Sequence, residues 1–303
     1  MIHHHLKELD SMKKFNPDII IAELVNNQQK IKSYDEIYYN KELDIVWKEF
    51  YYRDISTDIS DPHRLFQEFH RLVTTTHRHQ LPYFISKDQY LYTWVDLQPN
   101  GKLKCIYSGK QKDPYKLIKE DFKIIEKRFL LYQNLIKMHK ISNKHMDEKV
   151  QNIARQHRFN TEHVVPQSWY QAEEPMKGDL HHLFVCEPKC NNMRSNYPYY
   201  EYEDERPSVN KSMCGINRNE RFEPNFGKGV VARATLYFLL RYPNKITKKF
   251  KKTLDIPLLL RWHKQYKVTD YEKHRNKAIY EIQGNRNPFI DFPELMSHLA
   301  FPH

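Results

Sequence analysis

The residues best suited to chemistry lie near the middle of the chain, where Thr161–Pro166 reads TEHVVP. A β-strand would place Glu162 and His163 on opposite faces, so each side chain could reach a different part of one site. The two valines favour a strand, and Pro166 ends it. A histidine held there suits general-base catalysis, because imidazole titrates near neutrality and can take a proton from water. The competing interpretation, for a histidine without chemical partners, is a hydrogen-bonded structural residue.

Two further polar segments follow along the chain. Residues 179–183 read DLHHL, and residues 191–196 read NNMRSN. A hairpin followed by a helix would bring Glu162 close to an asparagine of that helix, and carboxylate and amide oxygens are hard ligands that suit Mg²⁺. A base on one side of a phosphate and a metal on the other could hydrolyse a phosphodiester. Zinc is the alternative metal, because His163 and the DLHHL segment offer three imidazoles.

Helices are predicted on both sides of this central segment. Ser60-Asp61-Pro62 is a good helix start, because proline fits the first turn. Apolar periodicity predicts further helices within 16–53, 117–137, 227–242, 254–266 and 271–283. The helix at 227–242 reads as buried, and an arginine buried on it, Arg233, would need a carboxylate or phosphate partner.

A β-hairpin is predicted between the first helices and the central segment. Residues 89–97 and 103–107 are rich in aromatic and β-branched side chains, and they flank an Asn100-Gly101 turn. The chain shows no regular alternation of strands and helices. These patterns predict the α+β class, helix-rich with a small antiparallel hairpin.

Composition narrows the class of protein. The chain has 303 residues with 49 Lys and Arg against 38 Asp and Glu, a net charge of +11 that favours a polyanionic partner. With 40% hydrophobic and 14% aromatic residues it can bury a core, which excludes global disorder. No apolar stretch approaches the roughly 20 residues of a membrane helix. The N-terminus has no recognisable export signal, so a cytoplasmic location is expected for the sequence as written.

Four cysteines are present, and their state is open from the sequence. Cys186, Cys190 and Cys214 could clip a loop, either as a disulfide or as a zinc site completed by a nearby histidine. Reduced buried thiols are about as well supported. Cys105 lies apart from the other three in the sequence.

Four segments together resemble the endonuclease I family of ββα-metal (His-Me finger) nucleases. They are NTEHVVPQSW (160–169), GDLHHL (178–183), NNMRSN (191–196) and QGNRNPFID (283–291). Residues 61–79 and 106–109 resemble the family's earlier elements, so the resemblance covers roughly residues 60 to 295. It implies a ββα-metal catalytic core, and it implies two parts of the chain: a helical N-terminal extension over 1–58 and a nuclease domain over 59–303.

The resemblance also implies roles for single residues. His163 takes the position of the general base, and Glu162 and Asn191 take those of the metal ligands. Mg²⁺ is the expected ion, with other divalent cations as alternatives. Asn192 is one register step from Asn191 and remains a second choice. Arg194 becomes a phosphate contact or a support for the ligands. Asp179, with His181 or His182, is expected to hold the hairpin of the ββα core in shape.

The expected activity is metal-dependent, largely sequence-nonspecific cleavage of DNA, with RNA as a second substrate, through contacts to backbone phosphates. No helix-turn-helix or other base-reading module is recognisable. The alternative from another class is a nucleic-acid-binding protein whose ββα site is structural and stabilised by zinc, without cleavage. Many family members are secreted or periplasmic, which leaves the location open, and the oligomeric state is not indicated.

Overall fold

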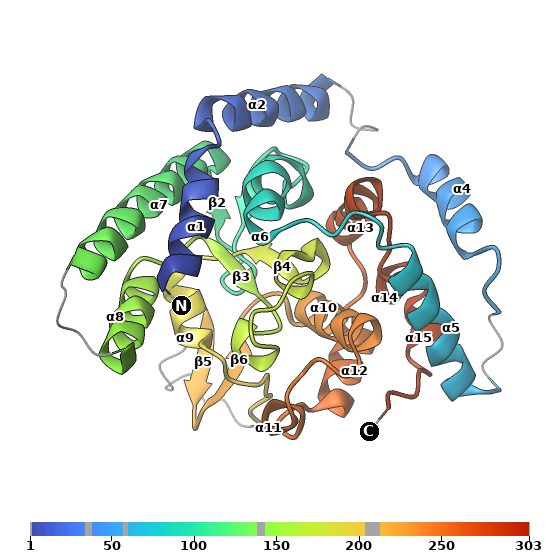
Figure 1. Ribbon diagram of the computed structural model, residues 1–303. Coiled ribbons are helices and arrows are strands. Elements are labelled where there is room, and N and C mark those ends of the chain that lie inside the picture. The colour runs from blue at the N-terminus through green and yellow to red at the C-terminus, as the bar shows by residue number, and fades with distance from the viewer. Residues whose placement is uncertain (1, 34–37, 57–59, 138–142, 204–212, 303) are drawn as a thin grey trace.

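The computed structural model describes residues 2–33, 38–56, 60–137, 143–203 and 213–302 (Figure 1). These residues form a helix-rich structure with three small two-stranded antiparallel sheets. The helix-rich α+β class is therefore confirmed. The predicted boundary between residues 58 and 59 lies outside the described residues. No helix in the described part of the chain is long and apolar enough to cross a membrane.

The helices and strands have the following bounds. The first half contains α1 (Ile2–Lys13), α2 (Pro17–Ser33), α4 (Lys41–Tyr52), α5 (Pro62–Thr75), α6 (Tyr83–Ile85), the π-helix η1 (Ser86–Val95), β1 (Leu103–Lys104), β2 (Gln111–Lys112), α7 (Pro114–Lys137) and α8 (Asn143–Gln156). The second half contains β3 (Thr161–His163), the short 3-10 turns η2 (Gln167–Trp169), η3 (Met176–Gly178) and η4 (Leu180–His182), β4 (Leu183–Val185), α9 (Pro188–Arg194), β5 (Gly215–Arg218), β6 (Arg221–Pro224), α10 (Lys228–Arg241), α11 (Lys248–Lys251), α12 (Ile256–Gln265), α13 (Asp270–Gln283), α14 (Pro288–Asp291) and α15 (Pro293–Met296).

The strands β3 and β4 lie between two hydrophobic cores. They pair antiparallel, with Glu162 opposite Phe184 and His163 opposite Leu183, and every residue of both strands is buried. Phe184 packs into a core with α5, α10 and α12, whereas Leu183 and Val185 pack into a second core with α1, α2 and α7. Alternate residues of a strand point to opposite faces. Packing on both faces therefore fixes the strand pair and the polar residues that it carries.

The buried helix predicted at 227–242 is α10, which packs against α12, α5 and α14. Arg233 on this helix is buried and donates two hydrogen bonds to Glu272 of α13. The Nε–Oε1 distance is 2.6 Å, and the Nη2–Oε2 distance is 3.1 Å. A bidentate pair of this kind compensates two charges taken out of water. It confirms the prediction that an arginine buried here has a carboxylate partner.

The other predicted helices also form. The segment after Ser60 becomes α5, and Asp61 caps it by accepting hydrogen bonds from the backbone N–H groups of His63 and Arg64. The helices predicted at 117–137, 254–266 and 271–283 correspond to α7, α12 and α13. Their ends differ from the predicted bounds by a few residues, as expected because helix ends are the least certain positions.

The hairpin predicted for residues 89–107 is wrong. Its first half is the π-helix η1, in which Leu91, Tyr92 and Val95 are buried. This helix packs against α2, α7 and α13, and tertiary packing overrides the strand preference of its aromatic and β-branched residues. The predicted turn does form, with Gly101 at a φ of 69°. It leads from η1 into β1, which pairs with β2 instead.

The N-terminal segment is helical, as predicted, and it shares cores with the rest of the chain. The helices α1 and α2 lie against α7 and η1 (Figure 1). Leu9 and Leu24 belong to the same hydrophobic core as Leu91 and Leu117. The helix α4 joins the other core through Tyr51 and its neighbour Tyr52. The described residues before the predicted boundary therefore do not pack as an isolated unit, and the division into two parts stays a prediction.

Candidate active site

A cavity of about 720 Å³ opens beside β3 and α9. Its wall includes Glu162 and His163 from β3 and Asn191 from α9, so the structure brings the predicted base and both predicted metal ligands together. Arg194, the fourth predicted site residue, is fully buried and does not belong to the wall. The exposed Asn192, the second choice for a ligand, also lines the cavity.

The imidazole of His163 is held in one orientation. Its Nε2 lies 2.9 Å from the backbone oxygen of Lys177, and its Nδ1 lies 3.1 Å from Nε2 of Gln167. A carbonyl oxygen can only accept, so Nε2 carries the proton, and the lone pair of Nδ1 accepts a hydrogen bond from the side-chain amide of Gln167. Burial, followed by the neighbouring His182, holds the pKa of His163 well below 6.5. The ring is therefore neutral at neutral pH and able to accept a proton at Nδ1.

The carboxylate of Glu162 is fixed by two neighbours. The hydroxyl of Tyr107 donates to Oε1 at 2.8 Å, and Nε of Arg194 lies 3.5 Å from the same oxygen. Arg194 is itself anchored, because its Nη2 donates to the backbone oxygen of Val164 at 2.8 Å. Burial raises the pKa of Glu162 from 4.5 to about 7, against the opposing effect of Arg194. The structure thus places Arg194 as a support of the carboxylate.

The amide of Asn191 is oriented by hydrogen bonds on both sides. Its Nδ2 donates to the backbone oxygen of Thr161 at 2.7 Å. This hydrogen bond distinguishes the amide nitrogen from the amide oxygen. Its Oδ1 accepts from Nη1 of Arg158 at 2.7 Å. The amide oxygen of Asn191 therefore faces the positively charged guanidinium of Arg158.

These side chains fit a hard divalent cation. Glu162 and Asn191 offer a carboxylate and an amide oxygen, the donors that Mg²⁺ prefers. Burial raises the pKa of Glu162, and a bound cation would oppose that effect by favouring the charged carboxylate. The alternative set of three imidazoles is not brought together. Nε2 of His181 contacts the backbone oxygen of Asn285, Nε2 of His182 contacts that of Met176, and neither ring lines the cavity.

The segment before β4 is held by Asp179, which is buried. It accepts hydrogen bonds from the hydroxyls of Tyr237 and Tyr242 at 2.9 and 3.0 Å and from Nε2 of Gln283 at 3.1 Å. The Asp179 carboxylate thus joins its own segment to α10 and to the end of α13. These contacts agree with the supporting role that the family resemblance implied for Asp179.

Several cavity residues were not predicted from the sequence. Four cations line the wall beside the predicted residues: Arg128, Arg155, Arg158 and Lys177. Arg158 lies only three residues before β3, so a search for cations flanking the TEHVVP motif would have found it. Gln167 lies within the quoted segment 160–169 and Tyr107 within 106–109, but neither was given a role, and the sequence did not place the N-terminal helix at the cavity.

The helix α1 forms one side of the cavity. His5, Glu8, Leu9 and Met12 all belong to the wall, and α1 lies against α7 and also contacts α8 (Figure 1). The carboxylate of Glu8 pairs with Nζ of Lys177, the residue whose backbone oxygen orients His163. The N-terminal segment thus takes part in building the cavity.

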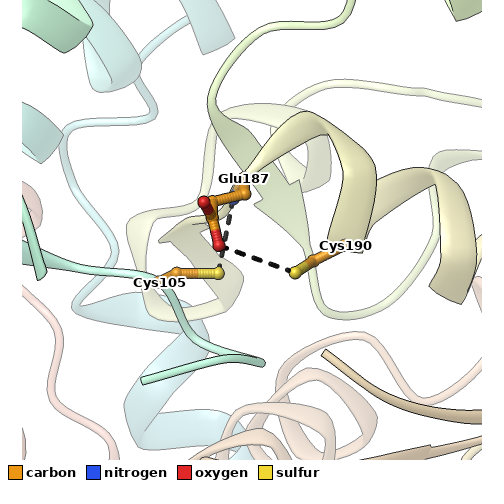
Figure 2. Close-up of side chains that lie close together, drawn as sticks. All are labelled: Cys105, Glu187 and Cys190. Carbon is orange, nitrogen blue, oxygen red and sulfur yellow. Dashed lines mark hydrogen bonds between the residues drawn. The ribbon is translucent and has the colours of Figure 1, made fainter. Parts of the chain in front are cut away.

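The structure also gives the cysteines a definite arrangement. Cys190 and Cys214 form a disulfide, and Cys105 and Cys186 carry free thiols. The sequence left open a zinc site of Cys186, Cys190 and Cys214 with a histidine. No histidine joins this cluster in the described part of the chain, where the side chains grouped closely enough for a metal are Cys105, Glu187 and Cys190 (Figure 2).

Comparison with known proteins gives consistent matches. The family model of Endonuclease I matches residues 74–294. Endonuclease-1 of Buchnera aphidicola subsp. Baizongia pistaciae (strain Bp) is 32% identical over 121 residues, which is 39% of this chain and 47% of that protein. The Periplasmic deoxyribonuclease of Aeromonas hydrophila is 28% identical over 155 residues, 44% of this chain and 63% of that protein. The Extracellular ribonuclease of Bacillus amyloliquefaciens is 34% identical over 130 residues, 38% of this chain and 44% of that protein.

The family match contains every cavity-lining residue outside α1. Fold, cavity and matches together place the chain among the nucleases. More particularly, it belongs to the endonuclease I family, as the sequence motifs predicted. The chain spans about half the length of the relatives it matches, so its own activity and substrate are argued separately below.

Proposed function

We propose that the chain is a metal-dependent endonuclease that hydrolyses phosphodiester bonds. In this proposal His163 is the general base, and Glu162 and Asn191 hold one Mg²⁺. The observation that carries the proposal is the convergence of these three side chains on one cavity, with the lone pair of His163 at Nδ1. A base and a hard-cation site in one cavity are what attack on a phosphate by water requires.

The residues have separate tasks. Nδ1 of His163 takes the proton of the attacking water once the amide of Gln167 gives up its hydrogen bond there, and the carbonyl of Lys177 keeps the ring in place. Tyr107 and Arg194 hold the carboxylate of Glu162. When bound, Mg²⁺ would stabilise the negative charge that develops on the phosphate and on the leaving oxygen. Arg158, whose Nη1 donates to Oδ1 of Asn191 at 2.7 Å, also lines the cavity and would add positive charge there.

The proposed substrates are DNA and RNA. The relatives include one named a deoxyribonuclease and one named a ribonuclease, and the net charge of +11 favours either polyanion. Arg155, Arg158 and Lys177 present cations in the cavity. Such cations contact backbone phosphates, which carry no sequence information, so we propose cleavage that is largely independent of sequence.

The first test is a cleavage assay with supercoiled plasmid and total RNA. We expect degradation with Mg²⁺ and none with EDTA. Glu162→Gln removes one metal ligand and should reduce cleavage by about 100-fold or more. Its matched control is Glu173→Gln, an exposed residue outside the cavity wall, which should cleave like the unmodified chain.

Three results would contradict the proposal. Cleavage that persists in EDTA would remove the metal, and equal activity of Glu162→Gln and Glu173→Gln would remove Glu162 as a ligand. Binding of DNA and RNA without any cleavage in Mg²⁺ would favour the alternative of a binding protein with a structural site.

A further inference from the structure

A run of lysines at α11 lies outside the cavity and has no part in the proposed hydrolysis. Residues 245–252 read KITKKFKK, and no aspartate or glutamate occurs from residue 224 to residue 254. Lys248, Lys249 and Lys252, called the lysine cluster below, are exposed. None of the three forms an ion pair with a carboxylate in the described part of the chain. The cluster therefore presents positive charge to solvent without an internal partner.

Two carboxylates near this run are engaged elsewhere. Oε2 of Glu173 lies 3.4 Å from Nζ of Lys245, so this pair offsets the first lysine of the run. Asp255, the first acidic residue after the run, caps α12 by accepting a hydrogen bond from the backbone N–H of Leu258 at 2.9 Å. The charge of the lysine cluster itself is left for an external anion.

Aromatic packing fixes α11 against the wall of the candidate active site. The ring of Phe250 stacks on that of Trp169, with centroids 5.5 Å apart and 14° between the planes. The backbone N–H of Thr247 donates to the backbone oxygen of Trp169 at 2.9 Å. Nε1 of Trp169 donates in turn to the backbone oxygen of Asn196 at 3.0 Å. Asn196 and Ser168 both line the cavity, so one buried tryptophan connects α11 with the cavity wall.

We infer that the lysine cluster binds backbone phosphates of the nucleic acid whose scissile bond lies in the cavity. The inference rests on the proposed function, because it extends the surface that binds the same substrate. Each strand of a duplex carries a phosphate at about every 3.4 Å along the axis, so a duplex extends well beyond a cavity of about 720 Å³. Its flanking phosphates must therefore be bound outside the cavity. Lysines bind phosphates as point charges, without reading bases.

An anionic membrane is the other large polyanion that lysines could contact. Segments that bind membranes combine basic residues with an apolar face that enters the lipid. The run offers no such face, because Ile246 is buried and Phe250 is packed on Trp169. The observations therefore favour a nucleic-acid backbone as the partner of the lysine cluster.

The test measures binding of the full chain to a DNA duplex of about 30 base pairs, roughly 100 Å long. It is made in EDTA, so the result does not depend on cleavage. The triple variant Lys248→Gln, Lys249→Gln, Lys252→Gln should bind about tenfold more weakly, or worse, at about 0.1 M salt. The slope of log Kd against log salt concentration should become shallower by about two to three, because each phosphate contact contributes about one. Arginine at the same three positions keeps the charge and should keep both the affinity and the slope.

The matched control is the triple variant Lys30→Gln, Lys32→Gln, Lys41→Gln. These lysines are exposed on α2 and α4, which lie at the top and right of Figure 1, whereas α11 lies at the bottom. The control loses the same net charge. Its affinity should stay within about twofold of that of the unmodified chain, because charges more than about 10 Å from the nucleic acid are screened at this salt concentration.

Three results would overturn the inference: unchanged affinity and slope in the α11 glutamine variant, equal weakening in both glutamine variants, or loss of affinity for phosphatidylserine-containing vesicles with DNA binding intact. If the α11 glutamine variant does not fold, the single variants Lys248→Gln and Lys252→Gln decide, each with a slope shallower by about one. DNA binding that depends on the lysine cluster in a chain that does not cleave in Mg²⁺ would support this surface and contradict only the proposed hydrolysis.

Discussion

At the scale of single residues, the proposed chemistry depends on the protonation of His163. Its ring is neutral because burial lowers the pKa, and the carbonyl of Lys177 directs the lone pair to Nδ1. We predict that His163→Ala lowers turnover by roughly 10² to 10⁴-fold, the usual contribution of a general base. Binding should change little, because the cations of the cavity remain. Initial rates on plasmid in excess Mg²⁺ and a separate binding assay check both parts.

His63→Ala is the control for this prediction, since His63 is exposed on α5 and does not line the cavity. It should behave like the unmodified chain in both assays. A His163→Ala protein that retains near-normal turnover would show that another group activates the water.

The same scale shows what residue types and spacing can predict. Residue types predicted Glu162, His163 and an asparagine of the following helix as a base and ligands for a hard cation. The family resemblance singled out Asn191, and the structure places all three in one cavity. The contacts that orient them could not be predicted. Tyr107 reaches Glu162 across 55 positions of sequence, and no local pattern encodes a contact that only the folded chain creates.

At the scale of elements, α1 sets the charge at one side of the cavity. Glu8 on this helix pairs with Lys177, which reduces the attraction of that lysine for a phosphate. We predict that Glu8→Gln lowers the KM for DNA by about two- to fivefold at low salt, the range expected for releasing one partly exposed ion pair. The value of kcat should be nearly unchanged, because Glu8 touches no proposed reacting group.

Asp10→Asn provides a matched charge change on the exposed side of the same helix. It should leave the KM unchanged, and any general effect of net charge would show in both variants. An unchanged or higher KM in Glu8→Gln alone would argue that Lys177 does not attract the substrate.

Elements differ in how far the sequence determines them. Helices such as α5 and α10 were predicted because a cap residue or a long apolar pattern specifies them locally. The segment that became η1 has aromatic and β-branched residues typical of a strand, yet it packs as a helix between α2, α7 and α13. Strand preference depends on neighbouring surfaces, so the sequence of that segment could not decide its structure.

At the scale of the whole molecule, the central strands are held between two cores. Phe184 faces one core, and Leu183 and Val185 face the other. A site built on such strands is rigid, because neither face of β4 can move without disturbing packed side chains. The same arrangement takes histidines on surrounding helices out of water, which links the stability of the fold to pH.

Burial lowers the pKa of His181 and of His263 to about 4. In the unfolded chain a histidine titrates near 6.5. Between these values the two histidines bind protons in the unfolded chain but not in the folded chain, so their contribution to the free energy of unfolding falls as pH decreases from about 6.5 to 4. Above about pH 6.5 these two residues make no pH-dependent contribution.

We predict that urea unfolding, followed from about pH 6.5 to pH 4, shows this loss of stability. In His263→Gln one titrating group is removed, and the slope should become shallower by up to about 1.4 kcal/mol per pH unit. His63→Gln, at an exposed position, should keep the original slope, and an unchanged slope in His263→Gln would show that His263 takes up its proton without unfolding.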